Sequence, residues 1–600
     1  MRLSDYVISF LEEKGVEHVF TLSGGGCLYL VDSLGSSNIE YICNLHEQGA
    51  AICAEAYAQY TNKPSAVLVT TGPGGTNAIT GVASAWLDSI PMIILSGQVP
   101  RKDMKGHRRV RQIGFQELDI VDMIKPITKY ATTVMEPSDI KHVLQEAYYL
   151  ATTGRQGPVW VDLPLDVQSA DIDVDKLRSF IPPEQPDRTL ELQKKITKVY
   201  DLINNSERPI ILAGNGVRSS GALEKFLSLT KKLKIPVLTT WKAIDFMDEN
   251  DSLFVGRPGI AGQRGANFSQ QNSDLFISIG ARLDLGQTAF NHKNFARCAK
   301  KVIIDVDEEE IKKMEFDIEC DLDFDAGTVI DEMTLQIDKL NTTFSDWVAT
   351  CKGWQKKYPV VLPDYWEQER GINNYVLIDV LSELMKPSDL LIPGSSGACS
   401  EVTMQTFRVK KGMRIFNSES LGSMGFGIPA SIGGCIAANR RHTICIDGDG
   451  GFVLNIQELE VIKRLQLPIK YFILNNGGYI SIRNSQDKHL DKQVASGEDT
   501  GVTLPNFEKI SNSYDIEYVK LTGQSDIYER VQEILNADGP VICEVDMAPK
   551  YHKHITAPRT STYKNKKGEF ATAPMEDLWP FLPREEFRKN MIVGVLEEDE

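Results

Sequence analysis

The sequence lacks the signals that would place the protein in a membrane, in the secretory route or on nucleic acid. It contains no apolar run long enough to cross a bilayer, and its N-terminus leads into an amphipathic helix rather than a signal peptide. Its formal net charge is −17, which disfavours a nucleic acid or an anionic membrane as a partner. We therefore expect a cytoplasmic protein that acts on small molecules.

Cysteine pairs, internal repeats and low-complexity segments are missing as well. The ten cysteines form no Cys-x-x-Cys motif. Most of them stand in apolar surroundings, which is typical of core thiols in a reducing compartment.

The length of the chain predicts several domains, because 600 residues are too many for one hydrophobic core. Short apolar runs alternate with helical segments, which predicts an α/β protein with three doubly wound parallel-sheet domains. We place these domains at residues 1–175, 190–340 and 374–547, with a linker from Asp171 to Arg188. We expect residues 548–600 to form either an arm or lid over the site or a surface-packed tail.

The stretch 448–476 carries the strongest chemical signal. It begins Gly-Asp-Gly-Gly after a short apolar run, which predicts a turn that follows a buried strand. Residues 455–465 have helical spacing, and a second apolar run then ends in Asn475 and Asn476. The acid and the amides should therefore meet at the carboxyl ends of two strands, where ligands bind in open α/β sheets.

These residue types suit a metal-bound diphosphate. Asp449 offers a hard anionic oxygen, Asn476 an amide oxygen and Gly478 a backbone carbonyl oxygen, which leaves room for phosphate oxygens and water around Mg²⁺. The glycines allow close approach of a diphosphate, and a helix N-terminus would add about 0.3–1 kcal/mol. The alternative is an ordinary tight turn in which Asp449 caps the helix.

The spacing of these motifs resembles the signature of the thiamin diphosphate-dependent enzymes, in which Asn-Asn follows Gly-Asp-Gly. Here 24 residues separate Gly450 from Asn475. From Met1 to about Met547 the chain is similar to the acetolactate synthase-like group of that family. The segment Tyr479 to Gln486 is more similar to relatives from surface-polysaccharide and branched-chain sugar pathways.

The resemblance implies the cofactors thiamin diphosphate and Mg²⁺, and pyrimidine-binding, central and diphosphate-binding domains in that order. It also implies a homodimer or homotetramer with active sites between subunits. The central domain binds FAD in acetolactate synthases but not in several relatives. Because the segment Gly256–Gly262 departs from the usual flavin-contacting pattern, FAD stays open.

The resemblance gives Glu47 the central catalytic role. A glutamate at this position bonds to N1′ of the aminopyrimidine and stabilises the imino tautomer, which takes the proton from the thiazolium carbon. On its own, Glu47 is equally typical of a carboxylate at the start of a helix. Gly25 matches the glycine loop at the edge of the active site, and Gly72 and Asn77 match a glycine turn near the pyrimidine.

Further residues face the substrate or the cofactor by the same resemblance. Phe115 and Gln116 match residues near the reacting carbon, and Gln116 is therefore also a catalytic candidate. The basic segment 101–111 is either a solvated face or a contact for a carboxylate or a nucleotide phosphate. Gly422 lends a carbonyl to the pyrimidine, and Met424 forces the cofactor's V shape, unless Met424 is ordinary core. The full cofactor-binding set is Glu47, Gly72, Asn77, Gly422, Met424, Gly448, Asp449, Gly450, Gly451, Asn476, Gly478 and Tyr479.

The reaction that follows from the resemblance is decarboxylation of a 2-oxo acid, most simply pyruvate, and carboligation of the resulting enamine to a second carbonyl. The acceptor is a second pyruvate or a nucleotide-activated keto-deoxysugar. A simple decarboxylase is disfavoured because the sequence has no adjacent His-His pair. A nucleotide- or flavin-binding oxidoreductase remains open on the strand–glycine turns alone, and a non-catalytic regulatory homologue is disfavoured by the presence of Glu47.

Overall fold

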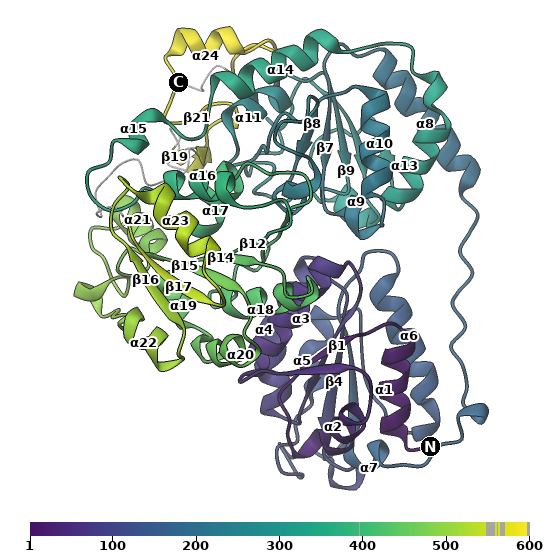
Figure 1. The fold of residues 1–600 in the computed structure, drawn as a ribbon. Helices are drawn as coiled ribbons and strands as arrows, with labels where there is room; N and C mark the ends of the chain where they lie inside the picture. Colours follow the sequence, from purple (N-terminus) through teal and green to yellow (C-terminus); the bar gives the residue numbers. More distant parts are fainter. Residues whose placement is uncertain (395–396, 548–558, 561, 565–569, 597–600) are drawn as a thin grey trace.

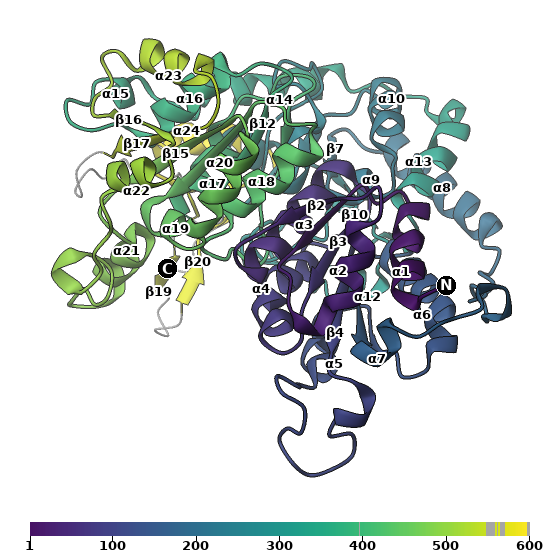
Figure 2. The ribbon, with the colours of Figure 1, turned by 60° about the horizontal axis from the view of Figure 1, so that its bottom comes forward.

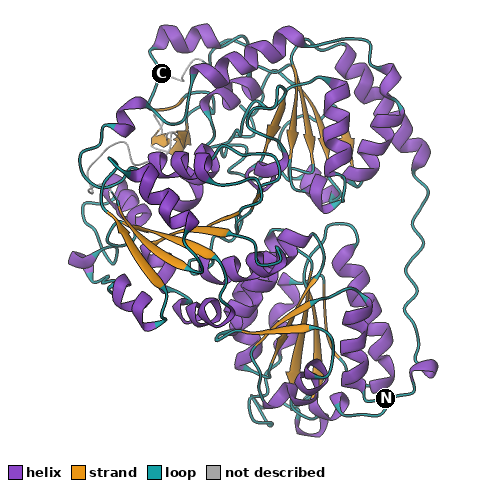
Figure 3. Cartoon of the chain, viewed as in Figure 1, coloured by secondary structure: helices purple, strands orange, loops and turns teal. Residues whose placement is uncertain are grey.

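The computed structural model describes residues 1–600 except 395–396, 548–558, 561, 565–569 and 597–600 (Figure 1). The chain forms three α/β domains, each with one parallel sheet covered by helices, which confirms the predicted fold class (Figure 3). The inner strands of the sheets are nearly continuous buried apolar runs, as expected for strands covered on both faces. Examples are β3 (Ser65–Val69), β4 (Met92–Gln98), β7 (Pro209–Ala213), β9 (Leu275–Ile279) and β15 (Ile469–Asn475). Of the helices that the structure describes, none is both long and apolar enough to cross a bilayer.

The first domain is built on a six-stranded sheet of order β2-β1-β3-β4-β6-β5. Its strands are β1 (His18–Thr21), β2 (Glu40–Cys43), β3 (Ser65–Val69), β4 (Met92–Gln98), β5 (Tyr130–Thr133) and β6 (Val159–Pro164). Its helices are α1 (Leu3–Glu13), α2 (Leu28–Gly35), α3 (Glu47–Thr61), α4 (Pro73–Leu87), α5 (Ile120–Ile124), α6 (Ile140–Thr152) and α7 (Leu165–Gln168).

The central domain has five strands in the order β11-β10-β9-β7-β8. They are β7 (Pro209–Ala213), β8 (Val237–Thr239), β9 (Leu275–Ile279), β10 (Lys300–Ile304) and β11 (Cys320–Leu322). Its helices are α8 (Thr189–Asn204), α9 (Gly216–Ser219), α10 (Leu223–Leu233), α11 (Arg264–Gln271), α12 (Glu308–Lys312), α13 (Ala326–Leu335) and α14 (Ser345–Lys357). The predicted linker runs as an extended chain along one side of the molecule between α7 and α8 (Figure 1).

The third domain has six strands in the order β13-β12-β14-β15-β17-β16. They are β12 (Leu390–Pro393), β13 (Arg414–Ile415), β14 (Thr443–Gly448), β15 (Ile469–Asn475), β16 (Glu517–Leu521) and β17 (Val541–Asp546). Its helices, with the preceding α15, are α15 (Pro363–Trp366), α16 (Asn374–Leu384), α17 (Gly397–Thr406), α18 (Gly427–Ala437), α19 (Asp449–Val453), α20 (Leu459–Leu465), α21 (Ile480–His489), α22 (Phe507–Ser513) and α23 (Ile527–Asn536).

Small residues join the first and third domains through α3. A Cβ atom on Gly81 of α4 would lie 2.6 Å from the Cβ of Ala51, and one on Gly433 of α18 would lie 2.0 Å from the carbonyl oxygen of Cys53. Glycine is therefore required at both positions for α3 to lie this close to α4 and α18. The small residues of α3 thus serve both the packing of the first domain and its interface with the third.

The described part of the C-terminal segment packs on the central domain. Trp354 donates its indole N–H to the side chain of Asn590 at 2.9 Å, and Arg297 pairs with Glu576 at 2.6 Å. This part, from 573 to 593, fits the surface-packed alternative, whereas residues 548–558 of the expected arm or lid lie outside the described residues. The elements of this segment are β18 (Arg559–Thr560), β19 (Thr562–Lys564), β20 (Phe570–Thr572), β21 (Leu578–Trp579) and α24 (Arg584–Asn590).

Candidate functional site

Asp449 follows β14 directly, and its carboxylate binds the turn that follows β15. One oxygen accepts the backbone N–H groups of Asn476 at 2.9 Å and Gly478 at 3.0 Å, and the other accepts that of Gly450 at 2.7 Å. β14 and β15 are parallel neighbours, so their carboxyl ends meet here, as the spacing predicts. Burial raises the pKa of Asp449, and the backbone N–H groups oppose that rise.

Arg483, which the sequence reading missed, holds the same turn from α21. Its guanidinium donates to the backbone oxygen of Asn476 at 2.8 Å, to the side-chain oxygen of Asn476 at 3.1 Å and to the backbone oxygen of Gly477 at 3.0 Å. Arg483 is 2% exposed. It therefore fixes the amide of Asn476, whose oxygen keeps a second lone pair for a ligand.

Gly450 lies between two side chains that the sequence assigns to the same site. A Cβ atom on Gly450 would lie 2.4 Å from a ring carbon of Tyr479 and 3.3 Å from the terminal methyl of Met424. A Cβ atom on Gly451 would lie 2.5 Å from the carboxylate of Asp447. The structure thus brings Met424, Tyr479 and the glycines after β14 together, and close packing requires the glycines.

The helix predicted over 455–465 is confirmed from Ile456 on, as a 3-10 turn over Ile456–Glu458 that leads into α20. A separate short helix, α19, precedes it; it begins at Asp449, with Gly448 as its N-cap, and ends at Val453. Asn455 separates the two helices, because it takes a left-handed conformation (φ +68°) and its side chain donates to the backbone oxygen of Gly425 at 2.9 Å. Since α19 has five residues, the dipole contribution expected from a full helix is reduced.

Asp447 is a second acid of this region that the sequence reading passed over. Its carboxylate accepts the hydroxyl of Tyr471 at 3.0 Å and the backbone N–H of Gly448 at 2.8 Å. Burial raises its pKa to about 6. The available signal was an acid that directly follows the apolar run 444–446 in the same strand.

Glu47 and Asn77 lie together in the first domain. Glu47 is the first residue of α3 and is 6% exposed, and the side-chain amide of Asn77 in α4 donates to its carboxylate at 2.9 Å. Just upstream, Asn44 and Leu45 donate to Glu458 of the third domain at 2.9 Å and 3.0 Å. The start of α3 is therefore fixed from both domains.

The predicted glycine turns of the first domain lie beside the Gln116 segment. Gly72 has φ +63°, and a Cβ atom there would lie 2.4 Å from the backbone oxygen of Gln116. Gly25 opens a 3-10 turn, and the N–H of the following Gly26 donates to the Thr70 hydroxyl at 3.1 Å. Gly72 thus lies next to Gln116, and the turn that Gly25 opens is tied through Gly26 to the end of β3.

The segment that carries Phe115 and Gln116 projects from the first domain between β4 and α5 (Figure 2). Phe115 is 87% exposed. Glu117 orders the segment from inside, because its carboxylate accepts the backbone N–H groups of Lys105, Ile113 and Gly114. Part of the predicted positive charge is neutralised locally, since Lys105 pairs with Asp119 at 2.5 Å.

The two groups of predicted residues are not joined within one chain. Among the described residues, no hydrogen bond links Glu47, Asn77 or Gln116 to Asp449 or Asn476.

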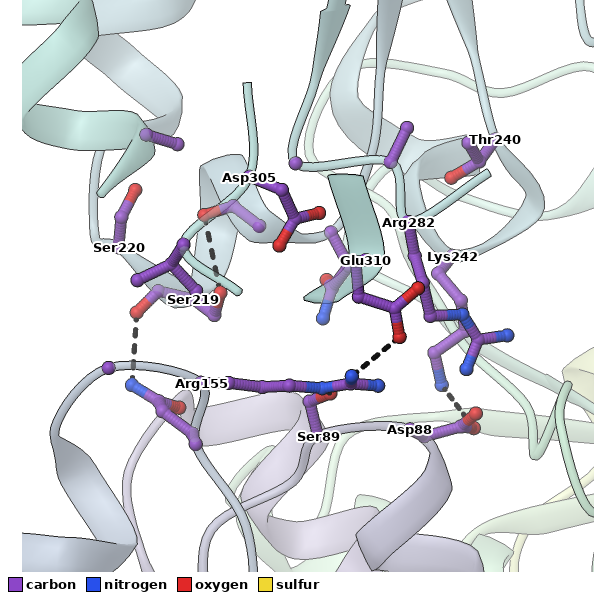
Figure 4. Close-up of a pocket in the computed structure, with 18 of the residues that line it drawn as sticks. Asp88, Ser89, Arg155, Ser219, Ser220, Thr240, Lys242, Arg282, Asp305 and Glu310 are labelled. Carbon is purple, nitrogen blue, oxygen red and sulfur yellow. Dashed lines mark hydrogen bonds and ion pairs between the residues drawn. The ribbon is translucent and has the colours of Figure 1, made fainter. Parts of the chain in front are cut away.

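A separate cleft lies where the central domain meets the first and third domains (Figure 4). Two adjoining hollows of about 320 Å³ and 860 Å³ share Arg155, Arg282 and Asp284 among their lining residues. The inner hollow lies at the glycine turns after β7 and β9, Gly216 and Gly280. Arg155 bridges Asp307 at 2.9 Å and Glu310 at 2.6 Å, and Lys242 pairs with Asp88 at 3.0 Å.

The segment Gly256–Gly262, which the sequence suggested as a flavin contact, does not line this cleft. Arg257 is fully buried, and its guanidinium donates to the backbone oxygens of Met404 at 2.8 Å and Phe407 at 2.9 Å. The segment instead anchors the central domain on the third domain. The residues that line the cleft are scattered along the sequence, which is why no local pattern identified them.

Comparison with known proteins agrees with the three-sheet architecture. Family models of thiamine pyrophosphate enzymes match the chain: the N-terminal TPP binding domain at residues 1–123, the central domain at 196–333 and the C-terminal TPP binding domain at 395–545. The acetolactate synthase large subunit of Lactococcus lactis is 32% identical over 551 residues, which cover 92% of this chain and 93% of the relative. The acetolactate synthase isozyme 1 large subunit of Escherichia coli is 29% identical, with 90% and 93% covered, and the chloroplastic acetolactate synthase of Arabidopsis thaliana is 31% identical, with 94% and 84% covered.

Proposed function

The chain belongs to the family of thiamine pyrophosphate enzymes, and on this premise we propose that it decarboxylates a 2-oxo acid such as pyruvate and joins the remaining carbon unit to a second carbonyl compound. The observation that carries the proposal is the turn held by Asp449. It brings one carboxylate, one amide and one backbone carbonyl to the carboxyl ends of β14 and β15. A relationship to acetolactate synthases over most of the chain supports the reaction class.

The residues of this edge fit a metal-bound diphosphate. Asp449, Asn476 and Gly478 would offer hard oxygen ligands to Mg²⁺, and Gly450 has no side chain where a Cβ atom would fill the space beside Tyr479 and Met424. When bound, thiamin diphosphate would supply the carbon nucleophile and the electron sink for decarboxylation. Met424 would press on the cofactor from below, and Gly422 would offer its backbone carbonyl.

Glu47 would hold the proton that the reaction needs at the pyrimidine ring. Asn77 donates to one carboxylate oxygen of Glu47, which fixes the direction of the other. A buried carboxyl in a fixed orientation is suited to sharing a proton with a ring nitrogen. Gly25, Phe115 and Gln116 would line the substrate side of this group.

We propose that the active sites form between subunits of a homodimer or a homotetramer. The exposure of Phe115, a substrate-side candidate, supports this arrangement. In a dimer, Glu47 of one subunit would then face Asp449 of the other.

Mixing inactive variants tests this arrangement directly. Unfolded and refolded mixtures of Glu47→Gln and Asp449→Asn subunits should recover about a quarter of wild-type activity, because half of the dimers are hybrids with one intact site. No recovery, with hybrids demonstrated by mass spectrometry, would place both residues of a site in one subunit. Each variant refolded alone is the control.

The acceptor is the least determined part of the proposal. A second pyruvate and a nucleotide-activated keto-deoxysugar both remain candidates, and the exposed basic residues beside Gln116 would favour an acceptor that carries phosphate. Incubation with labelled pyruvate, Mg²⁺ and thiamin diphosphate against a panel of acceptors, followed by mass spectrometry, separates the two. Release of labelled acetaldehyde alone would indicate a simple decarboxylase.

FAD is proposed as a ligand of the central cleft. The cleft is elongated, lies at the ends of β7, β9 and β10, and carries Arg155, Lys242 and Arg282, which could meet a pyrophosphate. Flavin absorption in the gently purified protein tests this assignment. A flavin-dependent oxidoreductase is the competing function, and its activity would not respond when Mg²⁺ and thiamin diphosphate are removed and restored.

A further inference from the structure

The segment 417–420, which leads into the cofactor residues of the third domain, is held from outside that domain. The carboxylate of Asp88, at the end of α4 in the first domain, accepts the backbone N–H of Glu419 at 3.1 Å and that of Ser420 at 3.2 Å. Each oxygen of Asp88 takes one of these bonds. The two contacts fix the backbone three and two residues before Gly422.

Two further contacts hold the same segment from other domains. Lys242 of the central domain donates to the backbone oxygen of Asn417 at 2.7 Å and to Asp88 at 3.0 Å (Figure 4 shows the Lys242–Asp88 pair). The hydroxyls of Ser84 in α4 and Ser418 are hydrogen-bonded at 2.7 Å. Three domains therefore meet at Asp88.

The downstream end of this segment is fixed inside the third domain. The side chain of Asn455 donates to the backbone oxygen of Gly425 at 2.9 Å. Gly422, with φ +60°, and Met424 lie between this anchor and Asp88. The position of Met424 thus depends on one anchor from its own domain and one from the first domain.

Asp88 is suited to this task because it is ionised although buried. It is 8% exposed, and burial opposes its ionisation, but Lys242 and the hydrogen bond to Ser420 hold its pKa below the ordinary value. A carboxylate binds backbone N–H groups more strongly than a neutral acceptor does. Loss of the Asp88 carboxylate would leave the backbone N–H groups of Glu419 and Ser420 with weaker hydrogen-bond acceptors at a buried position.

We propose that Asp88 is a positioning residue for thiamin diphosphate: it lines the central cleft, outside the residues proposed to hold thiamin diphosphate, and it sets the place of Gly422 and Met424 by holding residues 417–420. The inference rests on the proposed function, since it concerns affinity for thiamin diphosphate. It makes that affinity depend on how the first and central domains dock on the third.

The test measures thiamin diphosphate binding to the full-length protein by calorimetry in the presence of Mg²⁺, after the cofactor has been removed by dialysis. Asp88→Asn keeps the size of the side chain and removes its charge and one acceptor. We expect about a tenfold weaker binding. In a double-mutant cycle with Met424→Ala, the effect of Met424→Ala should be smaller in the Asp88→Asn background, because both changes act on the same contact.

Asp245→Asn is the matched control. Asp245 is also buried at the domain junction and pairs with Arg218 and Arg414, both at 2.7 Å, but it does not contact Glu419 or Ser420. We expect it to lower the melting temperature and to leave the dissociation constant within about twofold of wild type. If Asp88→Asn does not fold, Lys242→Met replaces it and should weaken cofactor binding in the same direction, by a smaller factor.

Three results would overturn the inference: unchanged cofactor affinity in the Asp88 or Lys242 variant, equal weakening in the Asp245 control, or strict additivity in the cycle. A wild-type protein that binds no thiamin diphosphate would instead overturn the proposed function itself. The two failures are therefore distinguishable.

Discussion

The edge at the carboxyl ends of β14 and β15, where we propose the diphosphate binds, and the central cleft are built by the chain in different ways. The edge comes from one strand–turn–helix–strand unit, in which Asp449 and the turn at Asn476 lie on neighbouring strands. The cleft takes Arg155 from the first domain, Lys242 and Arg282 from the central domain and Glu419 from the third. A local unit is fixed by its own hydrogen bonds, whereas a junction depends on how the domains dock.

This difference predicts that changes of the proposed metal ligands at the edge and of Glu47, which would face them, abolish turnover, whereas changes in the cleft modulate it. Three predictions test this contrast, and a fourth concerns the effect of Asp447 on stability.

Glu47→Gln should have the largest effect, a loss of about 10²- to 10⁴-fold in kcat with normal folding, because the amide cannot share a proton with the pyrimidine. Steady-state kinetics at saturating cofactor measures it. The matched control is Glu55→Gln, two turns along the same helix. Burial and the nearby Asp88 raise the pKa of Glu55 to about 8, so Glu55 is largely neutral at pH 7 and an amide replaces it closely. Equal losses of kcat in the two variants would show that Glu47 has no catalytic role that Glu55 lacks.

Asp449→Asn should weaken Mg²⁺-dependent binding of thiamin diphosphate by at least about 100-fold, since it removes the only charged ligand proposed for the metal. Calorimetry with and without Mg²⁺ measures the change. Its folding should be preserved, because an asparagine oxygen can still accept one of the backbone N–H groups. Cofactor affinity close to that of wild type would show that the metal does not bind at this edge.

Arg282→Met tests the cleft and should have a smaller effect. Arg282 donates to the backbone oxygen of Leu87 at 2.9 Å and pairs with Asp284 at 3.2 Å, and we expect its loss to weaken flavin binding about tenfold. Flavin fluorescence on titration measures the affinity, and binding of thiamin diphosphate should be retained. A variant that loses both ligands equally would show that the cleft and the edge are not separable.

Asp447→Asn should have the smallest effect, and its effect should depend on pH. The folded pKa of Asp447 is about 6, above the ordinary value of 3.8, so its ionised form is disfavoured by folding. In the wild type, the loss of folding stability caused by ionising the buried Asp447 is absent below about pH 4. It grows as the pH rises towards 6 and is complete above that pH. Relative to wild type, the variant should therefore gain on the order of 1 kcal/mol in stability between pH 4 and pH 8.

Thermal or urea unfolding at the two pH values measures this difference. A constant difference at both would show that folding does not raise the pKa of Asp447.

The same contrast explains what the sequence could and could not reveal. Glycine turns, apolar strands and the spacing of Asp449 and Asn476 are local, so they predicted that the carboxyl ends of β14 and β15 meet. Asp88 acts through hydrogen bonds to backbone groups more than 300 residues along the chain, and Arg483 acts on the backbone of a turn six and seven residues before it. Neither set of contacts leaves a spacing pattern. The helix expected over 455–465 is confirmed from Ile456 on, and only Asn455 departs from it, because its side chain binds Gly425.

The most direct test of the account is an experimental structure of the protein with thiamin diphosphate and Mg²⁺. We expect the metal at about 2.0–2.1 Å from oxygens of Asp449, Asn476 and Gly478, with Glu47 against the pyrimidine ring. Thiamin diphosphate bound in the central cleft, or a Glu47 carboxylate turned away from the pyrimidine, would contradict it.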